Sequence, residues 1–146
     1  MGEFLTIRNA FVSHLTTCGP YTAGEISTCD FGILSGVSGC AIVAMPGITT
    51  LEEMSFRSNP RNDFRHWGID GEIYVKDTGD PTGFNARIWQ ALDDFYTTIN
   101  KDGTLGGTSD NARLTRLGFV GFGELKDTAG QMFGVVRFNI IADKLT

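Results

Sequence analysis

The sequence has few of the residues on which catalysis commonly depends. Only two histidines, His14 and His66, occur among the 146 residues, and they are far apart in the chain. His14 follows Ser13 on an expected helix, where adjacent residues do not face each other, and we interpret His66 as a solvent-facing strand residue. The chain has no G-x-S-x-G nucleophile elbow and no phosphate-binding P-loop. We therefore expect no catalytic residue, no cofactor and no enzymatic activity.

The cysteines and carboxylates do not have the spacing of a metal site. Cys18, Cys29 and Cys40 include no C-x-x-C pair, and an odd number does not close into a disulfide framework. We expect reduced thiols, as in a cytoplasmic protein, with Cys40 as a small core residue. Residues 100–103 are similar to part of a calcium loop, but the first and last ligand positions hold no carboxylate. No metal site is predicted.

No apolar run is long enough to cross a membrane. The longest, Cys40–Met45, is far shorter than the roughly 20 residues of a spanning helix. Glu3 and Arg8 interrupt the apolar pattern at the N-terminus, so we expect no secretory leader. The formal net charge of −5 argues against general nucleic-acid binding, because such binding needs a cationic surface. Weak contact with DNA that passes through a pore is compatible with this charge.

The chain does contain enough apolar material for a core. Hydrophobic residues make up 41% of it, including 11 Phe and 2 Trp, which argues against low-hydrophobicity disorder. No internal repeat or linker divides the sequence, and its length suits one domain. We predict a single α+β domain over residues 1–146.

Two segments have the apolar periodicity of amphipathic helices. The first ends at Gly19-Pro20, because proline cannot continue a helix. Its apolar stripe is Phe4, Ile7, Phe11, Val12 and Leu15. The second spans Pro81–Asn100, with Asp80 as its N-cap and proline at its first position. Its apolar stripe is Phe84, Ile88, Leu92, Phe95 and Ile99.

The other periodic segments indicate β-strands. They are expected at 40–45, 51–57, 63–76, 112–122 and 132–142. The second and third strands would form one long hairpin, 51–76, with a charged tip. The last strand is apolar on both faces, which is typical of a central or covered strand, and Tyr21–Gly39 is expected to be a loop with a short turn or an edge strand. The predicted fold is α+β: an antiparallel β-sheet with a long β-hairpin, packed by two α-helices.

The charged tip of the expected hairpin is the strongest candidate for a binding site. Arg57, Arg61 and Arg65 cluster there, with Asp63 between them, in an otherwise acidic chain. Arginine suits bidentate recognition of carboxylates and phosphates. We predict that these four residues contact a neighbouring subunit or another partner that is acidic or carries phosphates; the alternative is a solvated turn without a function.

The order of the expected elements resembles that of the tail terminator proteins of long-tailed, siphovirus-like bacteriophages. The likeness extends from Phe4 to about Ala142. Its most specific part begins at the strand W-G-I-D-G-E-I-Y-V, Trp67–Val75, and continues through the second helix to D-G-T-L-G-G, Asp102–Gly107. The segment Tyr21–Gly39 has no counterpart in the family pattern.

The resemblance implies a structural role without a cofactor or an active site. Members of this family act as rings of six subunits that stop polymerisation of the tail tube once the length set by the tape-measure protein is reached. The other face of the ring receives the head–tail connector. The expected partners are further copies in a hexamer, the major tail tube protein, the connector, the tape-measure protein and, only as it passes through the lumen, genomic DNA. The expected location is the head–tail junction of the virion, and the host cytoplasm during assembly, without a membrane.

Two other functions fit the sequence. A head-completion or tail-completion protein of the phage neck is also a small ring-forming α+β protein. A domain of another class, which encloses a small apolar ligand between a curved sheet and a long helix, would use the abundant phenylalanines. The ligand-binding function can be tested by the placement of Phe119, Phe122, Phe133 and Phe138. If these side chains pack on the second helix, they are core residues. If they surround a shared cavity, ligand binding is favoured.

Overall fold

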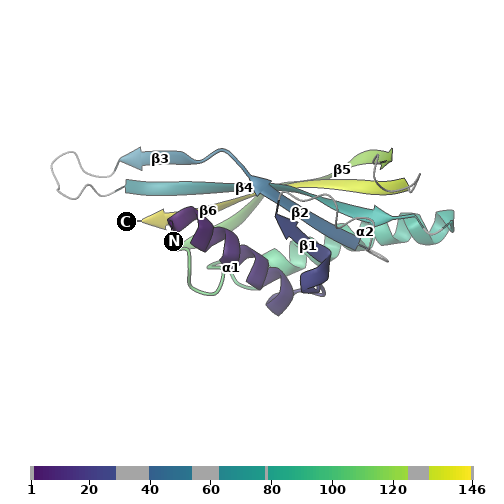
Figure 1. Ribbon diagram of the computed structural model, residues 1–146, viewed down its shortest axis with the longest axis horizontal. Coiled ribbons are helices and arrows are strands. Elements are labelled where there is room, and N and C mark those ends of the chain that lie inside the picture. Colours follow the sequence, from purple (N-terminus) through teal and green to yellow (C-terminus); the bar gives the residue numbers. More distant parts are fainter. Residues whose placement is uncertain (1, 29–39, 54–62, 78, 125–131, 146) are drawn as a thin grey trace.

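The structure, a computed structural model, describes residues 2–28, 40–53, 63–77, 79–124 and 132–145. Its elements are α1 (Glu3–Cys18), the 3-10 turn η1 (Ala23–Glu25), β1 (Ile26–Thr28), β2 (Cys40–Pro46), β3 (Thr50–Glu53), β4 (Asp63–Lys76), α2 (Pro81–Asn100), β5 (Asn111–Glu124) and β6 (Met132–Leu145). The strands form one sheet, and both helices lie on the same side of it (Figure 1). The fold is therefore α+β, as predicted, and it has two layers.

The sheet is mixed rather than fully antiparallel. Its strand order is β1-β2-β4-β6-β5, and β3 pairs with β4 beyond the end of β2. β1 runs parallel to β2, whereas the other paired strands are antiparallel. The expected antiparallel sheet is thus wrong at one edge, where Ile26–Thr28 lies beside β2. The predicted loop Tyr21–Gly39 contributes this short edge strand, and its residues 29–39 lie outside the described ranges.

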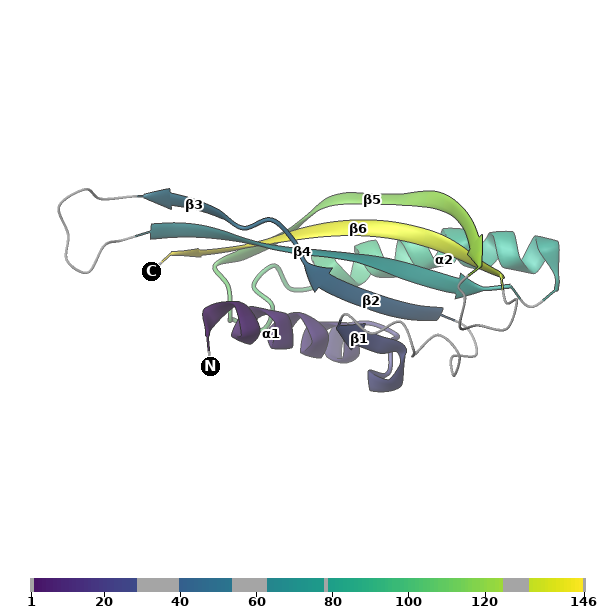
Figure 2. The ribbon, with the colours of Figure 1, turned by 45° about the horizontal axis from the view of Figure 1, so that its top comes forward.

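Only a short part of the predicted hairpin 51–76 is observed. β4 has the predicted bounds, but β3 pairs only four residues with it, from Thr50 opposite His66 to Glu53 opposite Asp63. The rest of the expected strand 51–57 and the hairpin tip lie outside the described residues. The long hairpin is therefore not confirmed. β3 and the adjacent ends of β4 and β6 project beyond the N-terminus of α1 (Figure 2).

The main core lies between the helices and the sheet. The buried residues of α2 are Phe84, Ile88, Ala91, Phe95, Thr98 and Ile99. The Phe138 ring of β6 contacts Phe95 of α2 and Phe11 of α1, with centroid distances of 4.5 and 6.0 Å. Gly71 of β4 makes room for this ring, because a Cβ there would lie 2.3 Å from it. The predicted extent of α2 is confirmed, and Asp80 occupies its N-cap position, although its side chain makes no capping hydrogen bond.

A second, smaller apolar cluster lies on the other face of the sheet. It consists of Ala41, Val43, Tyr74 and Phe133, with Val135 packed against them. Successive strand residues face opposite sides of a sheet, so β6 contributes Phe138 to the helix side and Phe133 to this side. The two-sided burial agrees with the position of β6 between β4 and β5.

Candidate interaction surfaces

The predicted charged cluster lies only partly within the described residues. Arg57 and Arg61 lie outside them, and Asp63 is described only as the first residue of β4. Arg65 follows on β4, so the structure places one of the three arginines fully. A contact between this cluster and a partner stays a prediction.

Arg65 has a partner within its own chain. Its guanidinium forms an ion pair with Glu3 in the first turn of α1, and Glu3 also accepts a hydrogen bond from Trp67 Nε1 at 2.8 Å. The next helical residue, Phe4, stacks on the Trp67 ring with a centroid distance of 5.2 Å. These contacts fasten the start of α1 to β4.

A buried carboxylate joins three strands near the projecting end of the sheet. Asp143 of β6 is 5% exposed, and its Oδ1 lies 2.5 Å from His66 Nδ1 of β4. Its Oδ2 accepts hydrogen bonds from Arg113 Nε at 3.2 Å and Asn111 Nδ2 at 3.4 Å, both on β5. Burial by itself raises the pKa of Asp143, but hydrogen bonds from His66 and Arg113, with the Arg113 charge, outweigh burial and lower it. The ionised carboxylate therefore holds β4, β6 and β5 together.

The interpretation of His66 as a solvent-facing residue holds only in part, since its side chain is 19% exposed and is bonded to Asp143. Sequence reasoning missed its contact with Asp143 because 77 residues separate the two. A histidine oriented by a carboxylate is part of a catalytic triad, but a triad also needs a nucleophile beside the other ring nitrogen. His66 is not among the residues that line a groove on the helix-free face of the sheet. The hydrogen bond between His66 and Asp143 joins strands β4 and β6.

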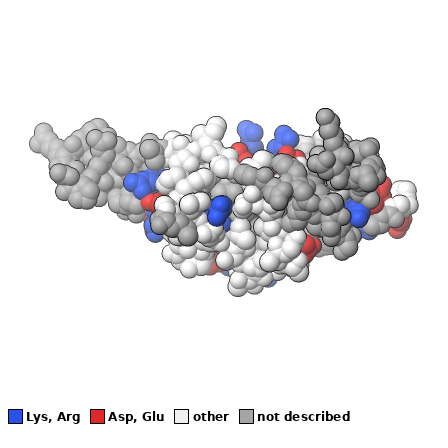
Figure 3. All heavy atoms as spheres, in the orientation of Figure 1, with Lys and Arg blue, Asp and Glu red and all other residues white. Residues whose placement is uncertain are grey.

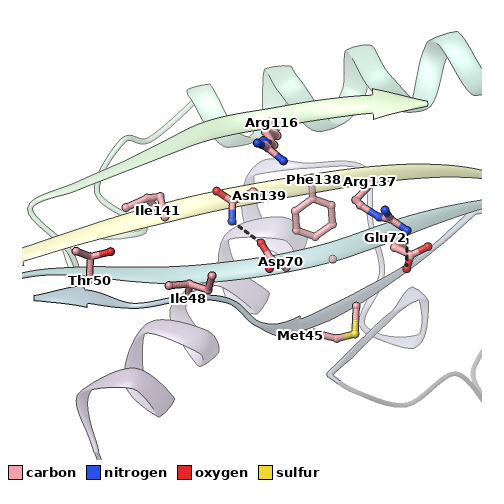
Figure 4. A pocket seen from close by; sticks show the side chains of 11 residues that line it. Met45, Ile48, Thr50, Asp70, Glu72, Arg116, Arg137, Phe138, Asn139 and Ile141 are labelled. Carbon is pink, nitrogen blue, oxygen red and sulfur yellow. Dashed lines mark hydrogen bonds and ion pairs between the residues drawn. The ribbon is translucent and has the colours of Figure 1, made fainter. Parts of the chain in front are cut away.

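The groove itself lies on the helix-free face and has a volume of about 680 Å³ (Figure 4). Polar residues from three strands line it: Asp70 and Glu72 from β4, Arg137 and Asn139 from β6, and Arg116 from β5. Asn139 donates a hydrogen bond to Asp70, and Arg137 Nη2 lies 3.9 Å from Glu72 Oε1. Basic side chains project from this side with acidic ones at their base (Figure 3). Acidic and basic side chains are thus interleaved along the groove.

The segment Asp102–Gly107, part of the family resemblance, has a local structural explanation. The Asp102 carboxylate accepts hydrogen bonds from the Thr104 amide at 2.9 Å, the Thr104 hydroxyl at 2.6 Å and the Gly106 amide at 2.8 Å. These bonds, the hydroxyl first, lower the pKa of Asp102. Leu105 is buried with φ 51°, and the two glycines after it adopt the left-handed conformations that glycine favours. The motif turns the chain from α2 towards β5.

The exposed apolar side chains gather mainly on one side of the molecule, at the β5 edge of the sheet. The described ranges contain eight large apolar residues that are exposed, and six of them are Trp89, Tyr96, Phe119, Val120, Phe122 and Met132. Trp89 is 68% exposed and Phe122 is 60% exposed. Exposed apolar side chains that gather on one side of a protein mark a candidate interaction site.

These six residues come from α2, β5 and the start of β6. On α2, Trp89 and Tyr96 continue a stripe with Asn85 and Leu92, at three- and four-residue spacing. Asn85 lines the same apolar cleft as Phe122, which places the stripe on the β5 side of the helix. We call the six exposed residues, with this stripe and the outer edge of β5, the β5–α2 surface.

The four phenylalanines that a pocket for an apolar ligand would bring together do not converge on one cavity. Phe138 packs on Phe95 of α2 and is core. Phe133 is buried on the opposite face of the sheet. Phe119 and Phe122 lie 5.2 Å apart at the surface. This distribution does not favour a shared ligand pocket.

Other site types find no support in the part of the chain that the structure describes. There, no three His, Cys, Asp or Glu side chains lie close enough to hold a metal ion, and neither α-helix is long and apolar enough to span a bilayer. Cys18 and Cys40 are free thiols, and Cys29 lies outside the described residues. Burial, with Glu25 and Asp94 nearby, raises the pKa of Cys40 to about 12, so this thiol is protonated at neutral pH.

Comparison of the chain with protein-family models and with curated proteins gave no match. The function proposed below therefore rests on the resemblance given above and on the geometry of the chain itself.

Proposed function

We propose that this protein is a tail terminator subunit of a long-tailed bacteriophage, a structural protein that caps the tail tube rather than an enzyme. The resemblance of the stretch from Trp67 to Gly107 suggests the family. The structural observation that supports an assembly role is the β5–α2 surface, where aromatic side chains are exposed beside a long strand edge. The usual explanation of such a surface is a protein partner.

The architecture suits a subunit of a ring. β5 is a 14-residue edge strand, and within the described residues its outer side has no strand partner. Unpaired N–H and C=O groups along an edge are a template for another chain. A ring of identical subunits, joined by head-to-tail contacts, covers such edges in every copy.

In this role a hexameric ring binds the end of the tube formed by the major tail tube protein. It stops polymerisation when the tape-measure length is reached and presents its other face to the head–tail connector. The net charge of −5 per chain suits a lumen that genomic DNA crosses without tight binding. The protein would be found at the head–tail junction of the virion, and in the host cytoplasm before assembly.

A stop codon at Trp89 tests this function, because it removes more than half of α2 together with β5 and β6. Negative-stain images of the lysate should show headless tails of irregular or excessive length. A suppressor host that inserts tryptophan at the stop codon should restore normal virions. Tails of normal length beside finished heads would instead indicate a neck-completion protein. Intact virions without suppression would contradict both functions. They would leave the apolar-ligand domain as the alternative, although Phe133 and Phe138 lie on opposite faces of the sheet.

A further inference from the structure

We infer that copies of this chain associate head to tail, with the β5–α2 surface of one copy on the opposite edge of the sheet of the next. The inference rests on the proposed function, because a terminator ring needs a contact between identical subunits. The structure assigns the two surfaces that make this contact.

The large exposed apolar residues of the described ranges lie on these two sides of the molecule. Six belong to the β5–α2 surface, and the other two are Leu5 and Ile48. Leu5 lies on α1 beside β1 and β2, and Ile48 lies between β2 and β3. Both are thus at the sheet edge opposite β5, so the apolar exposure of one edge has a counterpart at the other.

The opposite edge also contains a pocket that can accept an apolar side chain. A pocket of about 290 Å³ lies between the start of α1 and the strands β1 and β2. Leu5, Ala44, Pro46 and Ile69 are among the residues that line it. The pocket is at the small end of the range for ligand sites, and it suits an aromatic side chain of a neighbour. A protruding patch and a pocket elsewhere on the same molecule are the elements of a heterologous contact.

The strand directions agree with this contact. β5 is antiparallel to β6, and β6 is antiparallel to β4, so β5 and β4 run in the same direction. β3 runs opposite to β4, and a head-to-tail neighbour would therefore bring its β3 antiparallel to β5. Bulges after Leu114 and Phe119 interrupt β5, and its first uninterrupted run, Asn111–Leu114, has four residues, as β3 does. Within the described residues, these two edges are matched in direction and length.

The position of the pocket favours a head-to-tail contact over a two-fold one. A two-fold contact between two β5 edges would leave the pocket beside Leu5 uncovered, whereas the head-to-tail contact covers both sides.

Two charged substitutions on the two sides test the geometry by light scattering after size-exclusion chromatography. The unchanged chain should form oligomers larger than dimers. Trp89→Asp and Leu5→Asp should each weaken association by about tenfold or more. An equal mixture of the two variants should form dimers, because each variant retains the surface that the other lacks. Thr97→Asp, which adds the same charge on the outward face of α2, should leave the oligomers unchanged.

The outcomes separate the possible arrangements. A monomeric unchanged chain, or a mixture of the variants that stays monomeric, would overturn the inference. Oligomers that survive Leu5→Asp but not Trp89→Asp would overturn it in favour of a two-fold contact between β5–α2 surfaces. A misfolded variant cannot form dimers in the mixture, so their appearance also shows that both variants fold. Tail lengths in the stop-codon lysate test the proposed function separately. Overlong tails together with a monomeric purified chain would refute this contact and leave the terminator function standing. Intact virions together with dimers in the mixture of variants would refute the terminator function and leave the contact standing.

Discussion

The Asp143 carboxylate provides the most quantitative test of the fold, through the substitution Asp143→Asn. The change keeps the side-chain shape and removes the charge that His66, Arg113 and Asn111 share. A hydrogen bond to a charged group contributes about 1.5–3 kcal/mol. His66 and Arg113 can regain water, since their side chains are 19% and 48% exposed. We therefore expect a total loss of about 1–3 kcal/mol near neutral pH, which lowers Tm by roughly 2–4 °C for each kcal/mol in a domain of this size.

The loss depends on pH in a defined direction. The pKa of Asp143 is lower in the folded chain than in the unfolded chain, where an aspartate titrates at about 3.9. Its stabilisation is thus fully present above the unfolded pKa and is lost as pH falls through the folded pKa. Urea unfolding curves should show the largest difference between the unchanged chain and Asp143→Asn near neutral pH, and a smaller one in acid.

The control is Asp93→Asn, at an exposed position of α2, which should change the unfolding free energy little at any pH. A difference for Asp143→Asn that is the same at neutral and acid pH would refute the assignment of the effect to this carboxylate. A loss no larger than that of the control would refute the structural role of the network.

Three further changes test other contacts. Glu3→Gln removes the ion pair that fastens α1 to β4, and urea unfolding should show a loss of about 1 kcal/mol; no loss would refute the anchoring role. Gly71→Ala places a Cβ 2.3 Å from the Phe138 ring and should lower the unfolding free energy by about 2 kcal/mol or more, whereas Gly118→Ala, with no atom within 4 Å, should change it by less than about 1 kcal/mol. Cys40 has a pKa of about 12, so a thiol reagent at neutral pH should label it slowly in the folded chain and quickly in urea; equal rates would contradict its burial.

Elements with a clear periodic signal were predictable from the sequence. α2 and β4 have their predicted bounds, because Pro81 marks the helix start and regular apolar spacing marks both elements. The parallel edge formed by Ile26–Thr28 was not predictable, since three residues carry no period and their pairing with β2 is long-range. The predicted antiparallel sheet failed at this point alone among the described strand pairs.

The candidate surfaces were harder to predict, because they depend on how the strands pair. The contact between His66 and Asp143 requires the register of β4 against β6, which no local pattern fixes. Phenylalanine is usually a core residue, but Phe119 and Phe122 are exposed because β5 lies at the edge of the sheet. Hydrophobicity indicates that a side chain gains from burial, and it does not distinguish a core from an interface.

The most direct measurement of the terminator function is the length of tail tubes grown with the purified chain. Tail tube protein of the same phage would be polymerised with increasing amounts of the chain, and tube lengths would be measured by electron microscopy. We predict that amounts far below one chain per tube subunit stop growth, because one ring blocks one tube end. Tube growth that continues unchanged with equal amounts of the two proteins would contradict the proposed function.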